Sequence, residues 1–177
     1  LVRSRGLGDV YKRQETVVSA KEKCPDLTLV PPNYDLYNKS SKALIKLLSE
    51  YTDKIEQYSI DEAFLDMTGC CDDSEQTAHD IKDRVHAQLG FTVNIGVSEN
   101  KLLAKMASDF MKPDRVHTLW KSEIQTKMWP LPVSELFYVG HASLNKLRKL
   151  GIHTIGELAA TDPGILQAHM KSQGLLI

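Results

Sequence analysis

The sequence predicts an α+β fold that is followed by a small all-helical region. Up to about residue 120, short runs that alternate apolar and polar residues are mixed with amphipathic helical patterns, which is typical of a sheet covered by helices. From Lys121 onward the pattern changes to short helices with tight turns between them. The 177 residues are 42% hydrophobic and 25% charged, which is enough chain for one sizeable domain and a small satellite.

Residues 17–67 are predicted to form two helices and then two strands on either side of a short turn. The second helix begins at an N-cap, either Asn33 or Asp35, because both side chains accept hydrogen bonds from the first free amides of a helix. Before it, Leu27–Val30 favours β structure until Pro31 stops it. The helices are expected at Val17–Cys24 and from the N-cap to about Leu48, and the strands at Lys54–Tyr58 and Glu62–Met67.

Residues 72–120 are predicted to alternate helix and strand. A cap at Asp72-Asp73 begins one helix, and Gly90 closes it because glycine readily adopts the left-handed conformation of helix ends. The next helix is capped within Ser98–Asn100 and ends near Pro113. The strands of this part are expected at Phe91–Val97 and Val116–Trp120, and the later short helices at Val133–Val139, Ala142–Leu150, Thr154–Ala160 and Pro163–Met170.

The charge of −1 conceals a split along the chain. Residues 1–100 hold 12 lysines and arginines against 17 acids, whereas residues 101–177 hold 10 against 6. Such a division suits a protein that holds cations in one place and phosphates in another, although surface variation produces similar splits. The three cysteines form no disulfide framework, which favours a reducing, cytoplasmic compartment. No apolar run approaches the roughly 20 residues of a membrane span, so we expect no membrane partner.

Two adjacent acids, Asp61 and Glu62, interrupt the hydrophobic stretch YSIDEAFLDMTG at Tyr58–Gly69. A carboxylate is costly to bury without a cation or a hydrogen-bond donor, which indicates a divalent metal site, and Mg²⁺ prefers oxygen ligands. Successive strand residues point to opposite faces, so Asp61 must lie at a strand end or bulge for both acids to serve one site. The alternative is an exposed hairpin with two solvated acids.

Four blocks of the sequence resemble the Y-family (translesion) DNA polymerases. Tyr58–Gly69 is similar to the palm motif of that family, and Gly90–Pro113 to its second palm block. Cys24–Tyr37 resembles the join from fingers to palm, and Leu131–Ala159 resembles the thumb. Their order and spacing make the resemblance, which covers nearly all of Glu15–Ile177, far more specific than any single block.

The resemblance implies a reaction and its site residues. Asp61 and Glu62 match two of three carboxylates that hold two Mg²⁺ ions, as metal ligands and catalytic residues. The implied reaction is nucleotidyl transfer from a dNTP to the 3′-hydroxyl of a primer-template DNA during damage bypass. Lys112 matches the lysine that contacts the triphosphate, although a lone lysine before proline is also an ordinary loop charge. Lys101 and Lys105 either line the same channel or form the solvent side of their helix.

The thumb-like block resembles a helix-hairpin-helix that grips DNA. A turn containing glycine lets backbone amides approach a phosphate closely, and basic residues on the next helix add attraction that is independent of sequence. The alternative is an ordinary helical bundle with glycine caps. His141 stands where family members often carry a small residue, which leaves the phosphate contact open. The residues assigned to DNA binding are Val139, Gly140, His141, Lys146, Lys149 and Gly151.

The predicted domains are a scar at 1–14, a fingers remnant at 15–33, an incomplete palm at 34–120 with a mixed or antiparallel sheet, and a truncated thumb at 121–177. Residues 1–14 have no periodicity and resemble a translated sequencing adapter. The family's first metal-binding aspartate and its steric gate would precede Glu15, and Asp9 lacks the apolar strand expected around that aspartate. We therefore expect an interior fragment that is inactive alone, from a parent whose further regions bind the sliding clamp.

Two other functions stay open. A non-catalytic DNA-binding accessory of the same family would have lost its carboxylates, which Asp61 and Glu62 argue against. A different palm-type nucleotidyl transferase, such as a cyclase, also places acids on a sheet hairpin, but a cyclase needs no DNA clamp, so the block Leu131–Ala159 argues against it.

Overall fold

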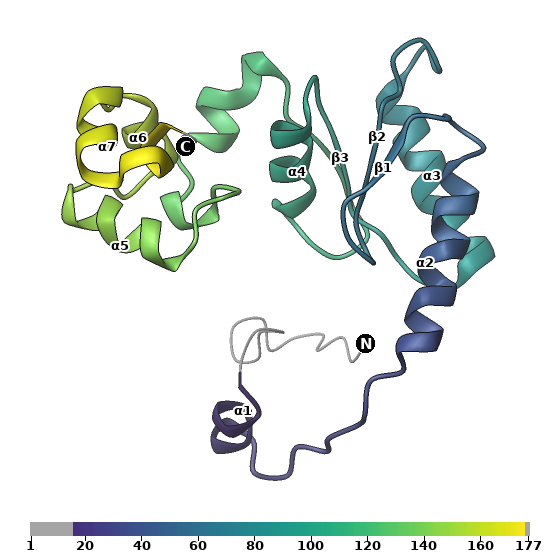
Figure 1. Cartoon of the computed structure of the whole chain (residues 1–177). Coiled ribbons are helices and arrows are strands. Elements are labelled where there is room, and N and C mark those ends of the chain that lie inside the picture. The colour runs from purple at the N-terminus through teal and green to yellow at the C-terminus, as the bar shows by residue number, and fades with distance from the viewer. Residues whose placement is uncertain (1–15, 176–177) are drawn as a thin grey trace. The chain divides into compact units, whose positions relative to one another are not determined.

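The computed structural model describes residues 16–175, and Figure 1 shows their elements along the chain. The chain divides into two units, residues 1–36 and 37–177. The predicted scar at 1–14 lies outside the described residues. No helix among the described residues is both long and apolar enough to span a membrane.

The first unit contains helix α1 (Val17–Lys23) and the extended segment after it. Thr16 caps α1 by accepting a hydrogen bond from the Ser19 amide at 3.2 Å. The prediction of a strand at Leu27–Val30 is wrong, because this segment has no regular structure and Val30 is 75% exposed. Strands are held by hydrogen bonds to a neighbour, and no strand among the described residues pairs with this segment.

Helix α2 (Tyr34–Leu48) begins in the first unit and continues into the second. The side-chain oxygen of Asn33 accepts a hydrogen bond from the Leu36 amide at 3.0 Å, so Asn33 is the N-cap. Helix α3 (Ser74–Leu89) begins at Asp73, which accepts bonds from two amides of the first turn, and ends at Gly90 with φ of 74°. Both helices match their predicted ranges.

The predicted strands are present but shorter than expected. Strands β1 (Ile55–Gln57) and β2 (Ala63–Leu65) pair antiparallel, with Ile55 opposite Leu65. Strands β3 (Ile95–Val97) and β4 (Val116–Thr118) pair parallel. The four strands therefore form two separate two-stranded sheets. Helix α4 (Lys101–Asp109) connects β3 to β4, and the side chain of Asn100 caps it. The mixed α and β character predicted from the sequence is confirmed.

The described residues of the second unit form two hydrophobic cores. In the first, α2 and α3 pack beside the β1–β2 hairpin, as Figure 1 shows, and Leu47, Leu48, Ile81 and Val85 are its buried residues. In the second, the buried face of α4 packs with Leu119 and with the helices that follow residue 120. Leu103, Met106 and Ala107 therefore share a core with residues such as Leu147.

A close contact fixes α4 against β3. A Cβ atom on Gly96 would lie 1.9 Å from the Ala104 carbonyl oxygen and 2.6 Å from the Ser108 nitrogen. These are backbone atoms of α4, which have no room to move aside. Only glycine therefore allows the helix to lie this near the strand.

Between residues 121 and 175 the structure contains three α-helices and several short helical turns. The prediction of a helix at Val133–Val139 is wrong beyond its first turn, because Leu136 is extended (φ −65°, ψ 126°) and Tyr138 is left-handed (φ 74°). Leaving the helix allows Leu136 to be buried in the second core. The elements are η1 (Lys121–Glu123), η2 (Ile124–Met128), η3 (Val133–Glu135), α5 (His141–Lys149), α6 (Ile155–Ala159), α7 (Pro163–Met170) and η4 (Lys171–Leu175).

Candidate active site and DNA interface

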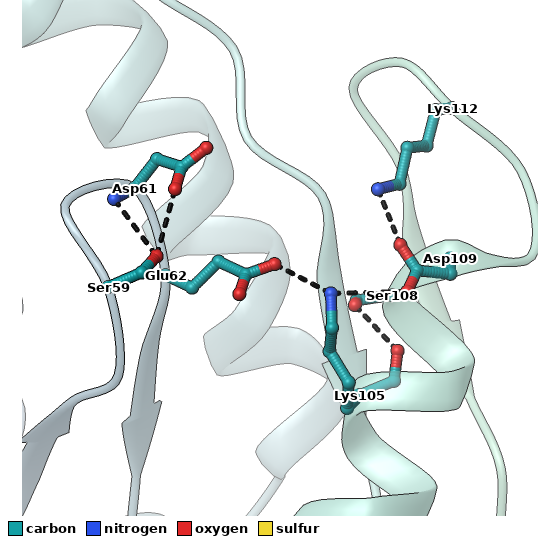
Figure 2. A network of polar contacts seen from close by, with 7 residues as sticks. All are labelled: Ser59, Asp61, Glu62, Lys105, Ser108, Asp109 and Lys112. Atoms are coloured by element: carbon teal, nitrogen blue, oxygen red, sulfur yellow. Dashed lines mark hydrogen bonds and ion pairs between the residues drawn. The ribbon is translucent and has the colours of Figure 1, made fainter. Parts of the chain in front are cut away.

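Asp61 and Glu62 lie in the turn between β1 and β2, and Figure 2 shows them with their polar neighbours. The amides of Tyr58 and Ser59 both donate to the Glu62 carbonyl, at 3.0 and 3.1 Å, and these bonds close the turn. The Ser59 hydroxyl donates to Asp61 Oδ1 at 2.9 Å and accepts from the Asp61 amide at 3.3 Å. Because the turn lies outside the strand ladder, the alternation of strand side chains does not force the two acids to opposite faces.

Glu62 is the first member of a line of alternating charges, the charge row, which consists of Glu62, Lys105, Asp109 and Lys112. The Lys105 ammonium lies 2.6 Å from Glu62 Oε1 and 3.1 Å from Asp109 Oδ2. The other Asp109 oxygen, Oδ1, lies 2.5 Å from the Lys112 ammonium. In Figure 2 the row runs from the hairpin turn across the end of α4 to the loop after it.

Burial differs along the charge row. The Lys105 side chain is only 15% exposed, whereas Lys112 at the far end is 51% exposed. Burial acts to lower the pKa of Lys105, but hydrogen bonds to Glu62 and Asp109 outweigh it and hold that pKa above its ordinary value. Burial acts to raise the pKa of Asp109, but bonds from Lys112 and Lys105 hold it below its ordinary value. The two middle groups of the row, Lys105 and Asp109, are thus held in their charged forms by their neighbours.

The carboxylates of the turn fit the chemistry of Mg²⁺. Asp61 and Glu62 offer oxygen atoms, the ligand type that Mg²⁺ prefers, and it often takes only one or two carboxylates from a protein. Among residues 16–175, no group of three or more histidine, cysteine or acidic side chains is placed to hold a metal ion. Within the described part of the chain, Asp61 and Glu62 could therefore offer a metal ion two carboxylates, and Glu62 already shares its carboxylate with Lys105.

The remaining lysine of α4 also faces the hairpin. Lys101 forms an ion pair with Glu56 of β1, and its ammonium lies 5.8 Å from the centre of the Phe64 ring. Both Lys101 and Lys105 thus contact the β1–β2 hairpin, but the Lys101 side chain is 61% exposed and that of Lys105 only 15%, so both alternatives considered for them stay open. Lys112 is not an isolated loop charge, because Asp109 links it to the charge row.

The residues assigned to DNA binding gather at the two ends of α5. Gly140 is the N-cap of α5 and provides no side-chain cap, and His141 is the first residue of the helix. A Cβ atom on Gly140 would meet nothing within 4 Å, and φ is −82°, so neither space nor backbone strain calls for glycine here. The open space above uncapped amides at a helix N-terminus suits an approaching phosphate.

The other end of α5 is basic and exposed. Lys146, Arg148 and Lys149 occupy its last turn, where cations are also favoured by the helix dipole. Gly151 has φ of 77°, so glycine is needed there for the turn itself. Val139 is half-buried before the helix and packs against the second core.

Two residues near the candidate sites were not singled out by the sequence analysis. Asp109 forms the middle of the charge row, and its spacing of four from Lys105 was the available signal. Tyr138 is 62% exposed with left-handed backbone, and its ring centre lies 4.2 Å from that of Phe137. Sequence patterns give no sign of a tyrosine in this conformation.

Two family models match the chain. One, described as the impB/mucB/samB family, matches residues 9–109, and one described as the IMS family HHH motif matches residues 121–152. The first match begins inside the stretch 1–14, whose assignment as a scar stays a prediction.

Named relatives agree with the matches to the two family models. DNA polymerase IV of Clostridium acetobutylicum is 50% identical over 165 residues, which are 92% of this chain and 42% of that protein. The crystal structure of a DinB family error prone DNA polymerase from Sulfolobus solfataricus has a TM-score of 0.81 at 27% identity, covering 94% of this chain and 51% of that one. An insertion ternary complex of Dbh DNA polymerase gives a TM-score of 0.80 at 27% identity, with 94% and 50% covered.

The chain therefore spans about half or less of the length of these proteins. Because the first family model alone matches more than half of the chain, the chain belongs to the impB/mucB/samB family, the Y-family DNA polymerase group that its sequence motifs resemble.

Proposed function

We propose that the whole protein to which this chain belongs is a translesion DNA polymerase. It transfers a nucleotide from a dNTP to the 3′-hydroxyl of a primer paired with a template. The observation that carries the proposal is the charge row, because it links Glu62, matched to a metal ligand, with Lys112, matched to the triphosphate contact. The names of the polymerase relatives support the same activity.

Asp61 and Glu62 would hold the two Mg²⁺ ions together with a third carboxylate from elsewhere in the protein. When bound, such ions stabilise the attacking and leaving oxygens of an in-line phosphoryl transfer. Lys112 and Lys105 would contribute positive charge toward the triphosphate in exchange for part of their pairing with Asp109 and Glu62, and fixed charge in a partly buried site stabilises negative charge better than water does.

The α5 region would hold the primer-template DNA. Amides at the start of α5 would bind a phosphate over Gly140, and the basic last turn would add attraction. Neither contact reads a base, which suits a polymerase that must move along every sequence.

The proposal extends to the setting of the protein. DNA lies in the cytoplasm of bacteria such as the Clostridium relative, and we place the reaction there. Recruitment by the sliding clamp through other regions of the protein belongs to the same proposal.

The 177 residues alone should not extend a primer, since their matching motif supplies two of the three carboxylates that the resemblance implies. Measurable extension by the purified chain would contradict this part.

The test is primer extension by the product of the complete reading frame from the source, with Mg²⁺ and all four dNTPs. Glu62→Gln should lower the rate by about 100-fold or more, the scale for removing one electrostatic stabilising group from an active site. The matched control is Glu56→Gln, because Glu56 also pairs with a lysine of α4 but lies in β1. If the complete protein binds DNA but extends no primer, the DNA-binding accessory function replaces the polymerase.

A further inference from the structure

Asp109 occupies an unfavourable place for an acid. It is the last residue of α4, where the partial negative charge of the helix end disfavours a carboxylate. The helix dipole therefore does not favour an acid at this position. Its side chain is 43% exposed, so burial does not explain it either.

The contacts of Asp109 suggest a different task. Each of its two oxygens has its own ammonium partner, with Oδ2 at 3.1 Å from Lys105 and Oδ1 at 2.5 Å from Lys112. Lys105 in turn divides its hydrogen bonds between Asp109 and Glu62, which lies closer at 2.6 Å. Lys105 and Asp109, each shared between two partners, thus link Glu62 to Lys112, the more exposed of the two lysines in the row.

We propose that Asp109 is a positioning residue that couples Lys112 to Glu62 through Lys105. An anion that takes Lys112 frees one side of Asp109, which then draws Lys105 away from Glu62. A cation that binds Glu62 has the reciprocal effect, because coupling between two sites acts equally in both directions. The proposed function identifies the anion as a triphosphate, whereas the coupling itself rests on the four residues of the row.

The test measures how fast each lysine is acetylated. The product of the complete reading frame is treated with an amine-specific acetylating reagent, and its peptides are analysed by mass spectrometry. Ion-paired ammonium groups react slowly, so the rate for each lysine reports whether it is held. Asp109→Asn should raise the rates of both Lys105 and Lys112 by about two- to fivefold, the range for partly exposed ion pairs. Lys127, which pairs with Glu123 at the same i,i+4 spacing as Lys105 and Asp109, is the internal control and should not change.

A double-mutant cycle separates the coupling from simple charge repulsion. Lys112→Met should lower the Lys105 rate, because Asp109 then holds Lys105 alone. In the Asp109→Asn background, Lys112→Met should leave the Lys105 rate unchanged. An equal effect of Lys112→Met in both backgrounds would mean that only the removed positive charge matters, and would overturn the proposal.

Two further measurements complete the design. Asp109→Glu keeps the carboxylate and should restore slow acetylation of both lysines, and thermal unfolding of each variant checks that it folds. Lys112→Met changes a half-exposed side chain, so its effect on Lys105 stays measurable whatever the stability of Asp109→Asn.

Tripolyphosphate without metal should slow acetylation of Lys112 and also of Lys105 in the wild type, but only of Lys112 in Asp109→Asn. Lack of protection in the wild type would refute the triphosphate role of the proposed function, while the cycle still decides the coupling.

Discussion

At the scale of single residues, the two adjacent acids of the hairpin turn have different partners. Asp61 bonds with Ser59 within its own turn, whereas Glu62 reaches Lys105 on α4. Figure 2 shows the two carboxylates turned toward these different neighbours. Replacing Asp61 therefore acts first on the turn, and replacing Glu62 acts first on the charge row.

Acid should weaken the contribution of Asp109 to stability. Its pKa in the folded protein lies below the ordinary value of about 3.9, so the folded state favours the charged form above that pH. The favourable contribution is present at pH 7 and is lost as the pH falls through the depressed pKa. The wild type should therefore exceed Asp109→Asn in unfolding free energy by less below about pH 4 than at pH 7.

Urea unfolding of both proteins at pH 7 and pH 3 measures this difference. Asp26→Asn, an exposed acid in the other unit, is the control. A difference that is the same at both pH values would show that the Asp109 carboxylate gains nothing from its lysines.

The sequence singled out Asp61, Glu62 and Lys112 as candidates because they lie in motifs that resemble a known family, but it gave no such reason to choose Asp109. Asp109 belongs to the charge row only through its ion pair with Lys105. Lys105 in turn contacts Glu62, which lies 43 residues before it in the chain. Only the fold brings Glu62 to the other three groups, so a local pattern shows the spacing of Lys105, Asp109 and Lys112 but not the whole charge row.

At the scale of elements, the contact between α4 and β3 holds the lysines of the charge row in place. Gly96→Ala would force a Cβ atom against the backbone of α4. We expect a loss of about 1–3 kcal/mol or more in unfolding free energy, as for overpacked cores, together with faster acetylation of Lys105. Gly90→Ala is an unsuitable control because of its φ of 74°, whereas Gly140→Ala adds the same methyl group in open space. Unchanged stability of Gly96→Ala would contradict the close packing.

The two glycines around α5 should respond in opposite ways. Gly140→Ala has room and an ordinary φ, so the fold should keep its stability while DNA binding weakens. Gly151→Ala should lower the unfolding free energy by about 1 kcal/mol, because φ of 77° strains any residue with a Cβ. Thermal unfolding and fluorescence anisotropy with a short DNA duplex measure the two effects. If Gly140→Ala and wild type bind DNA with equal affinity, Gly140 does not contact a phosphate, and the alternative of an ordinary helical bundle with glycine caps is favoured.

Helices were easier to predict than strands for a physical reason. Helix ends depend on local hydrogen bonds, such as those of Asn33, Asp73 and Asn100, which the sequence displays directly. Strand ends depend on the partner strand, so β3 covers only Ile95–Val97 of the predicted Phe91–Val97. The helix predicted at Val133–Val139 failed because burial of Leu136 overrides local preference.

At the scale of the second unit, one core joins α4 to the helical region after residue 120. Leu147 of α5 is fully buried in the same cluster as Met106 of α4. Leu147→Ala should lower the unfolding free energy by about 2–5 kcal/mol, as buried leucine truncations do. Because the core is shared, amide hydrogen exchange should rise in α4 as well as in α5.

The matched control is Leu48→Ala, which removes a buried leucine from the other core, between α2 and α3. It should loosen α2 and α3 more than α5. Faster exchange confined to α5 after Leu147→Ala would show that α4 does not depend on this core.

The shared core also has a mechanical consequence. In the proposed polymerase, α5 would hold the phosphates of the DNA, and its buried face shares the second core with α4. The same helix carries Lys105 and Asp109 on its other side. A shift of α4 within the shared core would therefore also move Lys105 and Asp109, so the proposed DNA contact and the charge row both depend on the position of this helix.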